Sequence, residues 1–248
     1  MKYLNTLALP LGILALWGAA SFVEIIDPLF LPSPLAVIDS IVTGLRSGQI
    51  THDLLATVLR SLAGFVLSAI IGIPLGLLIG RMQSLADATQ PTIDFFRSIP
   101  ATALFPLFLF LFGLGDIAKV AIVVYACSLI VLVNTAYGAR QVKASRILSA
   151  KVMGANHWDV FWKIIIPESA PGIFAGLRVA LSLSFVLIIV TEMFIGTNVG
   201  LGYQIMNAQM VYRIPEMYAD IIMAGGIGYI ANWTLLTVEA KILHWVGH

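Results

Sequence analysis

Charged side chains are scarce in this sequence. Lys, Arg, Asp and Glu make up 11% of its 248 residues, whereas hydrophobic residues make up 59%. A soluble domain carries about 25% charged and about 45–50% apolar residues, so this chain lacks the charged surface of a soluble globule. The apolar composition also excludes disorder, and a net charge of +1 gives no overall field for binding nucleic acid. The composition predicts a polytopic membrane protein.

Residues and motifs that carry chemistry are equally sparse. The single cysteine, Cys127, excludes an internal disulfide and a cysteine-based metal cluster. The histidines are scattered without metal-ligand spacing: His52, His157, His244 and His248. The chain contains no Gly-Lys dipeptide and therefore no phosphate-binding P-loop, and it has no G-x-S-x-G nucleophile motif. We predict no catalytic residue, bound metal or bound cofactor, and we expect that the chain is not an enzyme.

Apolar runs predict an all-α protein with about six transmembrane helices. A spanning helix needs about 20 mostly apolar residues, and such runs lie at about residues 4–26, 54–79, 92–112, 117–137, 173–194 and 218–243. Pro100 and Pro106 interrupt the third run, and such breaks occur at membrane depth only where protein or a cavity covers them. The whole chain, 1–248, is thus predicted as one transmembrane domain, with a first span in 1–27 and a core in 54–243.

The N-terminal run has an alternative interpretation as a signal peptide, because Ala19-Ala20-Ser21 offers small residues for cleavage. Its length and the spans that follow favour a membrane helix. After it, Leu31-Pro32-Ser33-Pro34 leads into an amphipathic stretch at 36–45. We expect a short helix there that lies on the membrane surface.

Basic residues predict the orientation, because loops rich in Lys and Arg stay in the cytoplasm. Five of the 14 basic residues fall between the fourth and fifth spans: Arg140, Lys143, Arg146, Lys151 and Lys163. Counting spans from this loop places both termini in the cytoplasm.

Small residues recur every four positions in the second span, at Gly64, Ser68, Gly72, Gly76 and Gly80. In lipid, such a stripe lets two helix backbones approach closely. It has two interpretations, static packing within the chain or a smooth face that slides during a transport cycle.

The loop at 140–171 predicts a helix–Gly–helix unit. Residues 144–153 favour a short amphipathic helix capped by Ser145, and Gly154 suits a left-handed helix stop. Asn156 is suited to cap a second helix, which we expect Pro167 to end. Large apolar side chains on this helix are typical of either a docking surface or an interfacial helix pair: Trp158, Phe161 and Trp162.

This unit resembles the EAA loop of bacterial ABC importer permeases, whose pattern is Glu-Ala-Ala, three residues, Gly, about nine residues, Ile, two residues and Pro. The corresponding stretches here read Leu148-Ser149-Ala150-Lys151-Val152-Met153-Gly154-Ala155 and Ile164-Ile165-Ile166-Pro167. The glycine and proline positions are kept, whereas the family's glutamate falls at Leu148 and its first alanine at Ser149.

Further segments are similar to the nitrate/sulfonate/taurine branch of these permeases. The similarity covers about residues 28–243, and the order and spacing of the segments make it specific. They are Leu31-Pro32-Ser33-Pro34, Arg60-Ser61, Gly72-Ile73-Pro74-Leu75-Gly76, Arg97-Ser98-Ile99-Pro100, Phe112-Gly113-Leu114-Gly115, Asn134-Thr135, Gly176-Leu177-Arg178, Glu192-Met193 and Gly200-Leu201-Gly202-Tyr203.

The resemblance implies a permease subunit in a bacterial inner membrane. Its partners would be ABC ATPase subunits that bind ATP-Mg, a second permease chain forming a homodimer, and an extracytoplasmic substrate-binding protein. In the family the EAA loop is the coupling helix that inserts into the ATPase. The matching coupling residues would be Leu148, Ser149, Ala150, Gly154, Ala155, Trp158, Ile164 and Pro167.

Polar residues at membrane depth are costly and are usually paired or face a cavity. As candidates for the translocation path we take Arg97, Ser98, Pro100, Asn134 and Glu192. Two of them have alternative structural roles: Arg97 can pair with Asp94 or reach the cytoplasmic surface, and Glu192 can be an interfacial carboxylate.

The resemblance leaves the substrate open between a nitrate-, sulfonate- or taurine-like anion and a pyrimidine- or riboflavin-type vitamin precursor. The main competing function is a stand-alone secondary transporter or channel, although no inverted repeats are evident. An intramembrane enzyme is a third alternative, which lacks paired catalytic residues.

Overall fold

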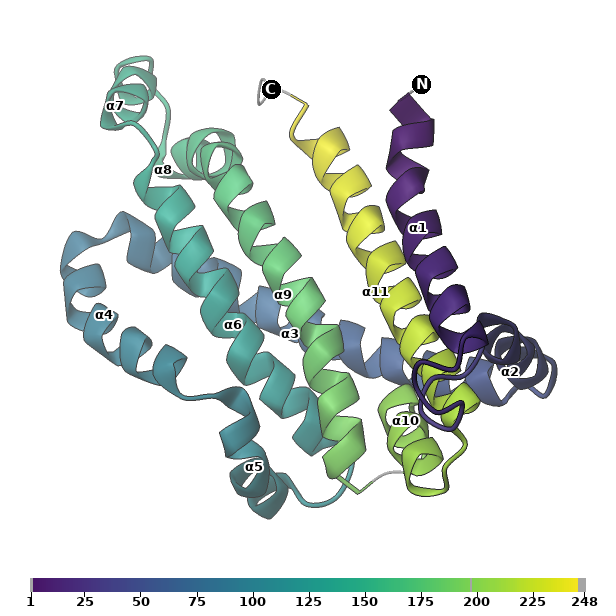
Figure 1. Cartoon of the computed structure of the whole chain (residues 1–248). Helices are drawn as coiled ribbons and strands as arrows, with labels where there is room; N and C mark the ends of the chain where they lie inside the picture. The colour runs from purple at the N-terminus through teal and green to yellow at the C-terminus, as the bar shows by residue number, and fades with distance from the viewer. Residues whose placement is uncertain (1, 197, 245–248) are drawn as a thin grey trace.

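The computed structural model describes residues 2–196 and 198–244, which are helices joined by short loops. The predicted all-α fold is confirmed (Figure 1). The elements are α1 Lys2–Phe22, α2 Pro34–Arg46, α3 Gln49–Arg81, α4 Gln83–Ser98, a 3₁₀ turn η1 Ala101–Leu104, α5 Phe105–Phe112, α6 Asp116–Arg140, α7 Ala144–Val152, α8 His157–Val160, a π turn η2 Phe161–Ile165, α9 Ile166–Phe194, α10 Leu201–Met210 and α11 Ile214–Ile242.

Within the described residues, four helical segments are long and apolar enough to cross a membrane: α3, α6, α8 to α9 taken as one segment, and α11. The predicted third span is a broken one, because α4 and the η1–α5 segment bend by 81° at a break formed by Ile99 and Pro100. With this pair the count is up to five. The predicted first span is α1, and its described apolar part is Ala8–Phe22.

Helices α3, α6 and α9 form the packed centre of the bundle. Val123, Cys127 and Val131 of α6 meet Ala180 and Ile188 of α9 in a fully buried cluster. The small-residue stripe of α3 lies against α6: a Cβ atom at Gly72 would lie 2.9 Å from the Ser128 carbonyl oxygen. Contact this close places the backbones of α3 and α6 directly against each other.

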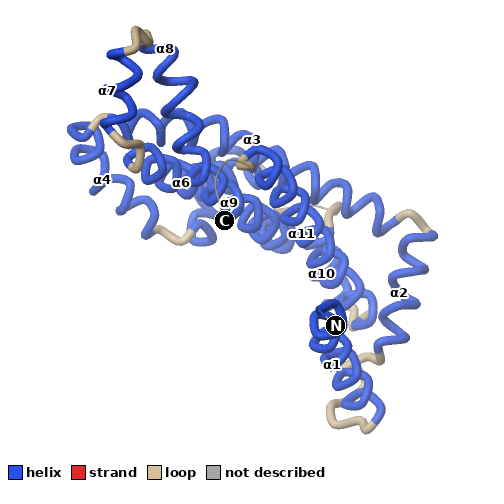
Figure 2. Tube along the Cα trace, turned by 90° about the horizontal axis from the view of Figure 1, so that it is seen from above, coloured by secondary structure: helices blue, strands red, loops and turns tan. Residues whose placement is uncertain are grey.

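Helix α2 forms where the amphipathic pattern predicts it. Ser33 is the N-cap, with its hydroxyl accepting a hydrogen bond from the Ala36 amide at 3.2 Å, and Pro34 opens the helix. Seen from above, α1 and α2 lie at one edge of the molecule and α4 and α7 at the other (Figure 2). Trp17 attaches α1 to α11, because its ring stacks on Tyr218 with centroids 5.9 Å apart.

The two ends of the bundle differ. The start of α1, the end of α11 and the α7–α8 loop lie at one end, whereas α2, α5 and α10 lie at the other (Figure 1). The termini and the basic loop thus share an end of the bundle, as the predicted topology requires. Which membrane side this end faces stays a prediction.

Candidate functional site

The α7–α8 unit, residues 144–165, projects from the bundle beyond the end of α6 (Figure 1). Gly154 separates its two helices with φ of +89°, a left-handed conformation that favours glycine. The N-cap of α7 is Lys143, which makes no side-chain capping bond, so the predicted capping role of Ser145 is wrong. Ser145 lies inside the first turn of α7, one residue after its start.

Asn156 caps α8 as predicted. Its side-chain oxygen accepts from the Asp159 amide at 2.9 Å, and the Asp159 carboxylate accepts from the Asn156 amide at 3.4 Å, which completes a capping box. Lys163 adds an ion pair to Asp159 at 2.6 Å. These bonds fix the backbone conformation in which the loop enters α8.

Pro167 does not end this second helix, contrary to the prediction. The chain stays helical from α8 through η2 into α9, and the Ile166 amide donates to the Phe161 carbonyl five residues back. The proline follows this π turn as the second residue of α9. The fifth span is therefore continuous with the loop.

One face of the α7–α8 unit is anchored and the other is free. Phe161, Ile165 and Ile166 pack near Ala139 of α6 and Ile173 of α9, and Arg146 pairs with Glu168 at 2.7 Å. Leu148, Val152, Met153 and Trp158 are 64–82% exposed. Of the other predicted coupling residues, Ser149 is exposed, Ala155, Ile164 and Pro167 are half-buried, and Ala150 is buried.

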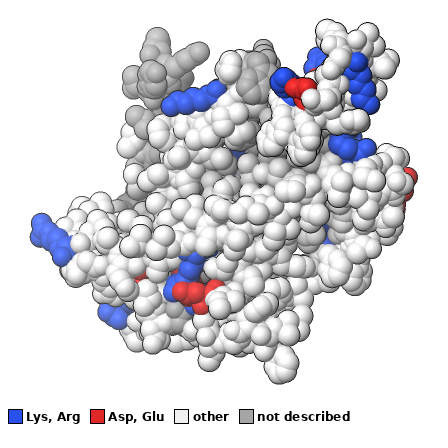
Figure 3. Space-filling model, turned by 180° about the vertical axis from the view of Figure 1, so that it is seen from behind, with Lys and Arg blue, Asp and Glu red and all other residues white. Residues whose placement is uncertain are grey.

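Charge is also concentrated on this unit. Figure 3 shows broad uncharged faces along the bundle and Lys and Arg side chains on the α7–α8 unit at the upper right. An exposed apolar patch with a basic surround is typical of a protein-docking surface.

A second polar site, the Glu192 cluster, lies at the opposite end of the bundle. We define it as Thr57 and Arg60 of α3, Asp116 of α6, Glu192 of α9 and the Gly202 amide of α10. Glu192 is 1% exposed and accepts from Thr57 at 2.8 Å, Arg60 at 2.6 Å and the Gly202 amide at 3.1 Å. Arg60 also pairs with Asp116 at 2.8 Å. One buried carboxylate thus joins α9 to α3 and α10, and through Arg60 to α6.

Side chains of α3 also cap the start of α10. Asp53 accepts from the Gly200 amide at 2.8 Å, and the Thr57 hydroxyl accepts from the Leu201 amide at 3.0 Å. Gly200 has φ of +130°, and a Cβ atom there would collide with the Glu192 carboxylate. The Gly200-Leu201-Gly202-Tyr203 motif therefore lets the backbone reach the carboxylate.

The other path candidates lie in two separate places. Arg97, Ser98 and Pro100 flank the break between α4 and η1, where Arg97 pairs with Asp94 at 3.7 Å. A cavity of about 200 Å³ beside α4 is lined by Arg97 together with Tyr137 and Arg140 of α6. Asn134 instead faces Gly176 at the α6–α9 contact. The structure therefore brings together three of the five candidates, and Glu192 and Asn134 lie apart from them.

Sequence reasoning missed the partners of Glu192. Asp53, Thr57 and Ser61 continue the buried face of the α3 stripe toward its start, in steps of three and four residues from Gly64, and all three are buried. This continuation of the buried face, with polar residues in place of glycine, was the sequence signal that could have indicated a polar cluster. Asp220, buried in α11, was also missed.

Residues 72–243 match the family described as Binding-protein-dependent transport system inner membrane component. A probable ABC transporter permease protein of Brucella melitensis is 30% identical over 98% of this chain and 96% of its own. A putative aliphatic sulfonates transport permease protein of Escherichia coli is 31% identical over 96% and 90%. This chain belongs to that family of inner-membrane permease components, as its resemblance indicated.

A solved structure agrees on the fold. A chain of the MetNI methionine ABC transporter, in an inward-facing conformation, superposes with a TM-score of 0.66 over 76% of this chain and 96% of its own, at 16% identity. Together with the family match, this defines a permease subunit of a binding-protein-dependent ABC importer.

Proposed function

We propose that the α7–α8 unit is the docking element for an ABC ATPase, and that the chain works as a homodimer in a bacterial inner membrane. The ATPase subunits would bind ATP-Mg, and an extracytoplasmic binding protein would deliver the solute. The observation that carries the proposal is the exposed apolar face of Leu148, Val152, Met153 and Trp158 on an otherwise anchored loop. Under this proposal the α7–α8 end, and with it both termini, faces the cytoplasm.

The mechanism follows from the continuity of α8 with α9. Closure of the ATPase pair would displace α8, and the unbroken helix from His157 to Phe194 would transmit that displacement across the bundle. The permease contributes by stabilising outward- and inward-open states differently. No residue of the chain needs to perform chemistry in this scheme.

For the solute we propose a small anion of the sulfonate type. Two observations support it: the named substrate of the Escherichia coli relative, and the cavity lined by Arg97, Arg140 and Tyr137, in which one carboxylate, Asp94, faces two guanidinium groups. Guanidinium groups suit a sulfonate because they offer paired N–H donors with positive charge. Competition between an alkanesulfonate and a pyrimidine in an uptake assay separates this substrate from a vitamin precursor.

Replacing Trp158 with alanine is expected to weaken docking strongly. Truncation of a Trp anchor costs about 2 kcal/mol or more at an interface, or about 30-fold in affinity. Co-purification of the ATPase and ATP hydrolysis coupled to substrate-loaded binding protein report the loss. The matched control is Trp233→Ala, since Trp233 is 58% exposed on α11, against 71% for Trp158.

Equal ATPase recovery with both Trp variants would contradict the docking proposal. Uptake into proteoliposomes that needs an ion gradient but neither ATP nor a second protein would favour the stand-alone transporter instead.

A further inference from the structure

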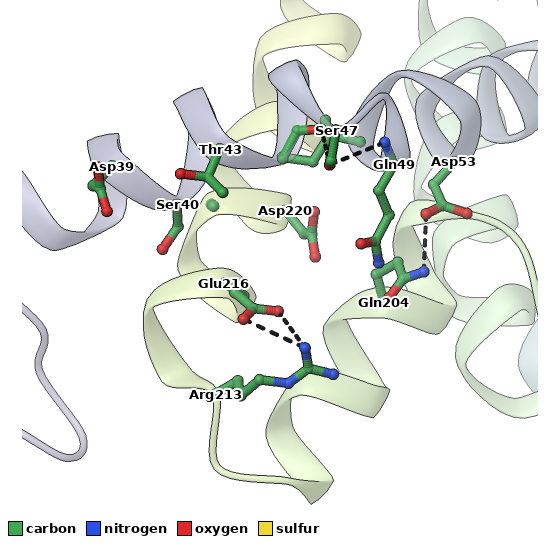
Figure 4. Close-up of a pocket in the computed structure, with 13 residues that line it drawn as sticks. Asp39, Ser40, Thr43, Ser47, Gln49, Asp53, Gln204, Arg213, Glu216 and Asp220 are labelled. Carbon is green, nitrogen blue, oxygen red and sulfur yellow. Dashed lines mark hydrogen bonds and ion pairs between the residues drawn. The ribbon is translucent and has the colours of Figure 1, made fainter.

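A polar cavity of about 410 Å³ lies beside the start of α3, between α2, α10 and α11 (Figure 4). This volume falls within the range of small-molecule sites. Its charged lining is mainly acidic, with Asp39, Asp53, Glu216 and Asp220 against a single cation, Arg213. None of these residues has a role in the ATPase docking proposed above.

The acidic side chains differ in how they are compensated. Glu216 pairs with Arg213 at 3.0 Å. Asp53 accepts hydrogen bonds from the Gly200 amide at 2.8 Å and from Gln204 at 2.9 Å, both of which are neutral donors. Arg213 is therefore already paired with Glu216, and Asp53 has no cationic partner among the residues around the cavity.

Asp220 has no partner among the residues that the structure describes. Its exposed fraction is 6%, and no hydrogen bond or ion pair joins its carboxylate to another residue in 2–196 or 198–244. Figure 4 shows the carboxylate pointing into the open space between Thr43 and Gln204, above Arg213 and Glu216. A carboxylate with so little exposure and no partner is unfavourable, and a cation that entered the cavity it borders would relieve that cost.

The shape of the site determines which cation fits. The described His, Cys, Asp and Glu residues form no group of three suited to a metal ion. The cavity is roomy, and its acceptors come from three helices, with Thr43 on α2, Asp53 on α3 and Asp220 on α11. Acceptors distributed in this way suit a polyatomic cation with several N–H donors, such as a guanidinium or primary ammonium group.

We propose that this cavity binds a small organic cation through a guanidinium or primary ammonium group, with Asp220 as the principal anion. Asp53 supplies the second negative charge, and Thr43 and Gln204 supply neutral contacts. The inference goes beyond the proposed import of an anion and does not depend on it.

The test titrates methylguanidinium and butylammonium into the full-length chain in lipid nanodiscs, with binding followed by calorimetry and by thermal unfolding. Both cations are expected to bind and to raise the unfolding temperature of the unmodified protein. Asp220→Asn keeps the side-chain volume but removes the charge, and it is expected to weaken binding by about tenfold or more, because a charge-assisted hydrogen bond contributes about 1.5–3 kcal/mol.

Two controls make the result specific. Asp39→Asn removes the same charge from an exposed residue at the edge of the cavity and is expected to change affinity less than Asp220→Asn. Tetramethylammonium carries the same charge without N–H donors and is expected to bind more weakly than methylguanidinium.

The outcomes are distinct. Without any cation, Asp220→Asn is expected to unfold at a higher temperature than the unmodified protein, which also shows that the variant folds. Absence of binding by both probes would mean that a proton alone neutralises Asp220, and equal affinity in Asp220→Asn would place the probes elsewhere. Either result overturns the proposal. Because no ATPase is present in the assay, failure of ATPase docking leaves this result unaffected.

Discussion

Glu192→Ala is expected to lower the free energy of unfolding by about 3–5 kcal/mol, the range found when one partner of a buried ion pair is removed. Arg60 and Thr57 of α3 and the Gly202 amide of α10 all lose an acceptor at once. Arg60 keeps Asp116 as a partner, but that carboxylate is 59% exposed and interacts through a more polar environment. Thermal unfolding in detergent measures the change.

The same variant is expected to loosen α10 before the rest of the bundle. Hydrogen exchange at the Leu201 and Gly202 amides is the local measurement, because these amides bond to Thr57 and Glu192. Glu192→Gln keeps the volume and one acceptor oxygen, so it is expected to fall between the alanine variant and the unmodified protein.

The matched control is Glu168→Ala, on the same helix. Glu168 also pairs with an arginine, Arg146, at 2.7 Å, but Arg146 is 59% exposed. Exposed pairs contribute about 0–1 kcal/mol. Equal losses for the Glu168 and Glu192 variants would contradict a special role for the Glu192 cluster in holding α10.

Sequence periodicity could predict the elements whose environment is uniform along the helix. The α3 stripe is one example, since Gly72, Gly76 and Gly80 lie at one spacing and meet one neighbour, α6. Gly154 is another, because a left-handed residue between two short helices is a local requirement. The spacing of the stripe and the position of Gly154 between two helices are both local features of the chain, which a sequence displays directly.

The Glu192 cluster could not be assembled in this way. Its bonds join residues 10, 132 and 135 positions apart, and only the folded bundle brings them together. The continuity of α8 with α9 was missed for a different reason. Pro167 is typical of a helix boundary, but here the helix continues through the π turn ahead of the proline and on into α9.

Gly76→Ala is expected to destabilise the bundle by about 1–3 kcal/mol, the usual cost of forcing extra volume into a packed contact. The new Cβ atom would lie 2.6 Å from the Leu132 carbonyl oxygen and 2.6 Å from the Thr135 Cβ. The carbonyl belongs to the α6 backbone and cannot rotate away as a side chain can, so α3 and α6 must separate. Thermal unfolding measures the loss.

Gly226→Ala is the control, because Gly226 also lies inside a spanning helix, α11, and a Cβ atom there would meet nothing within 4 Å. Helix propensity alone then favours alanine by about 1 kcal/mol, so this variant is expected to unfold at the same or a higher temperature. If Gly76→Ala lowers the unfolding temperature and Gly226→Ala raises it, the loss at Gly76 is assigned to contact with α6. Equal unfolding temperatures would contradict direct backbone packing, and a stable Gly76→Ala protein with reduced uptake would favour the sliding interpretation of the stripe.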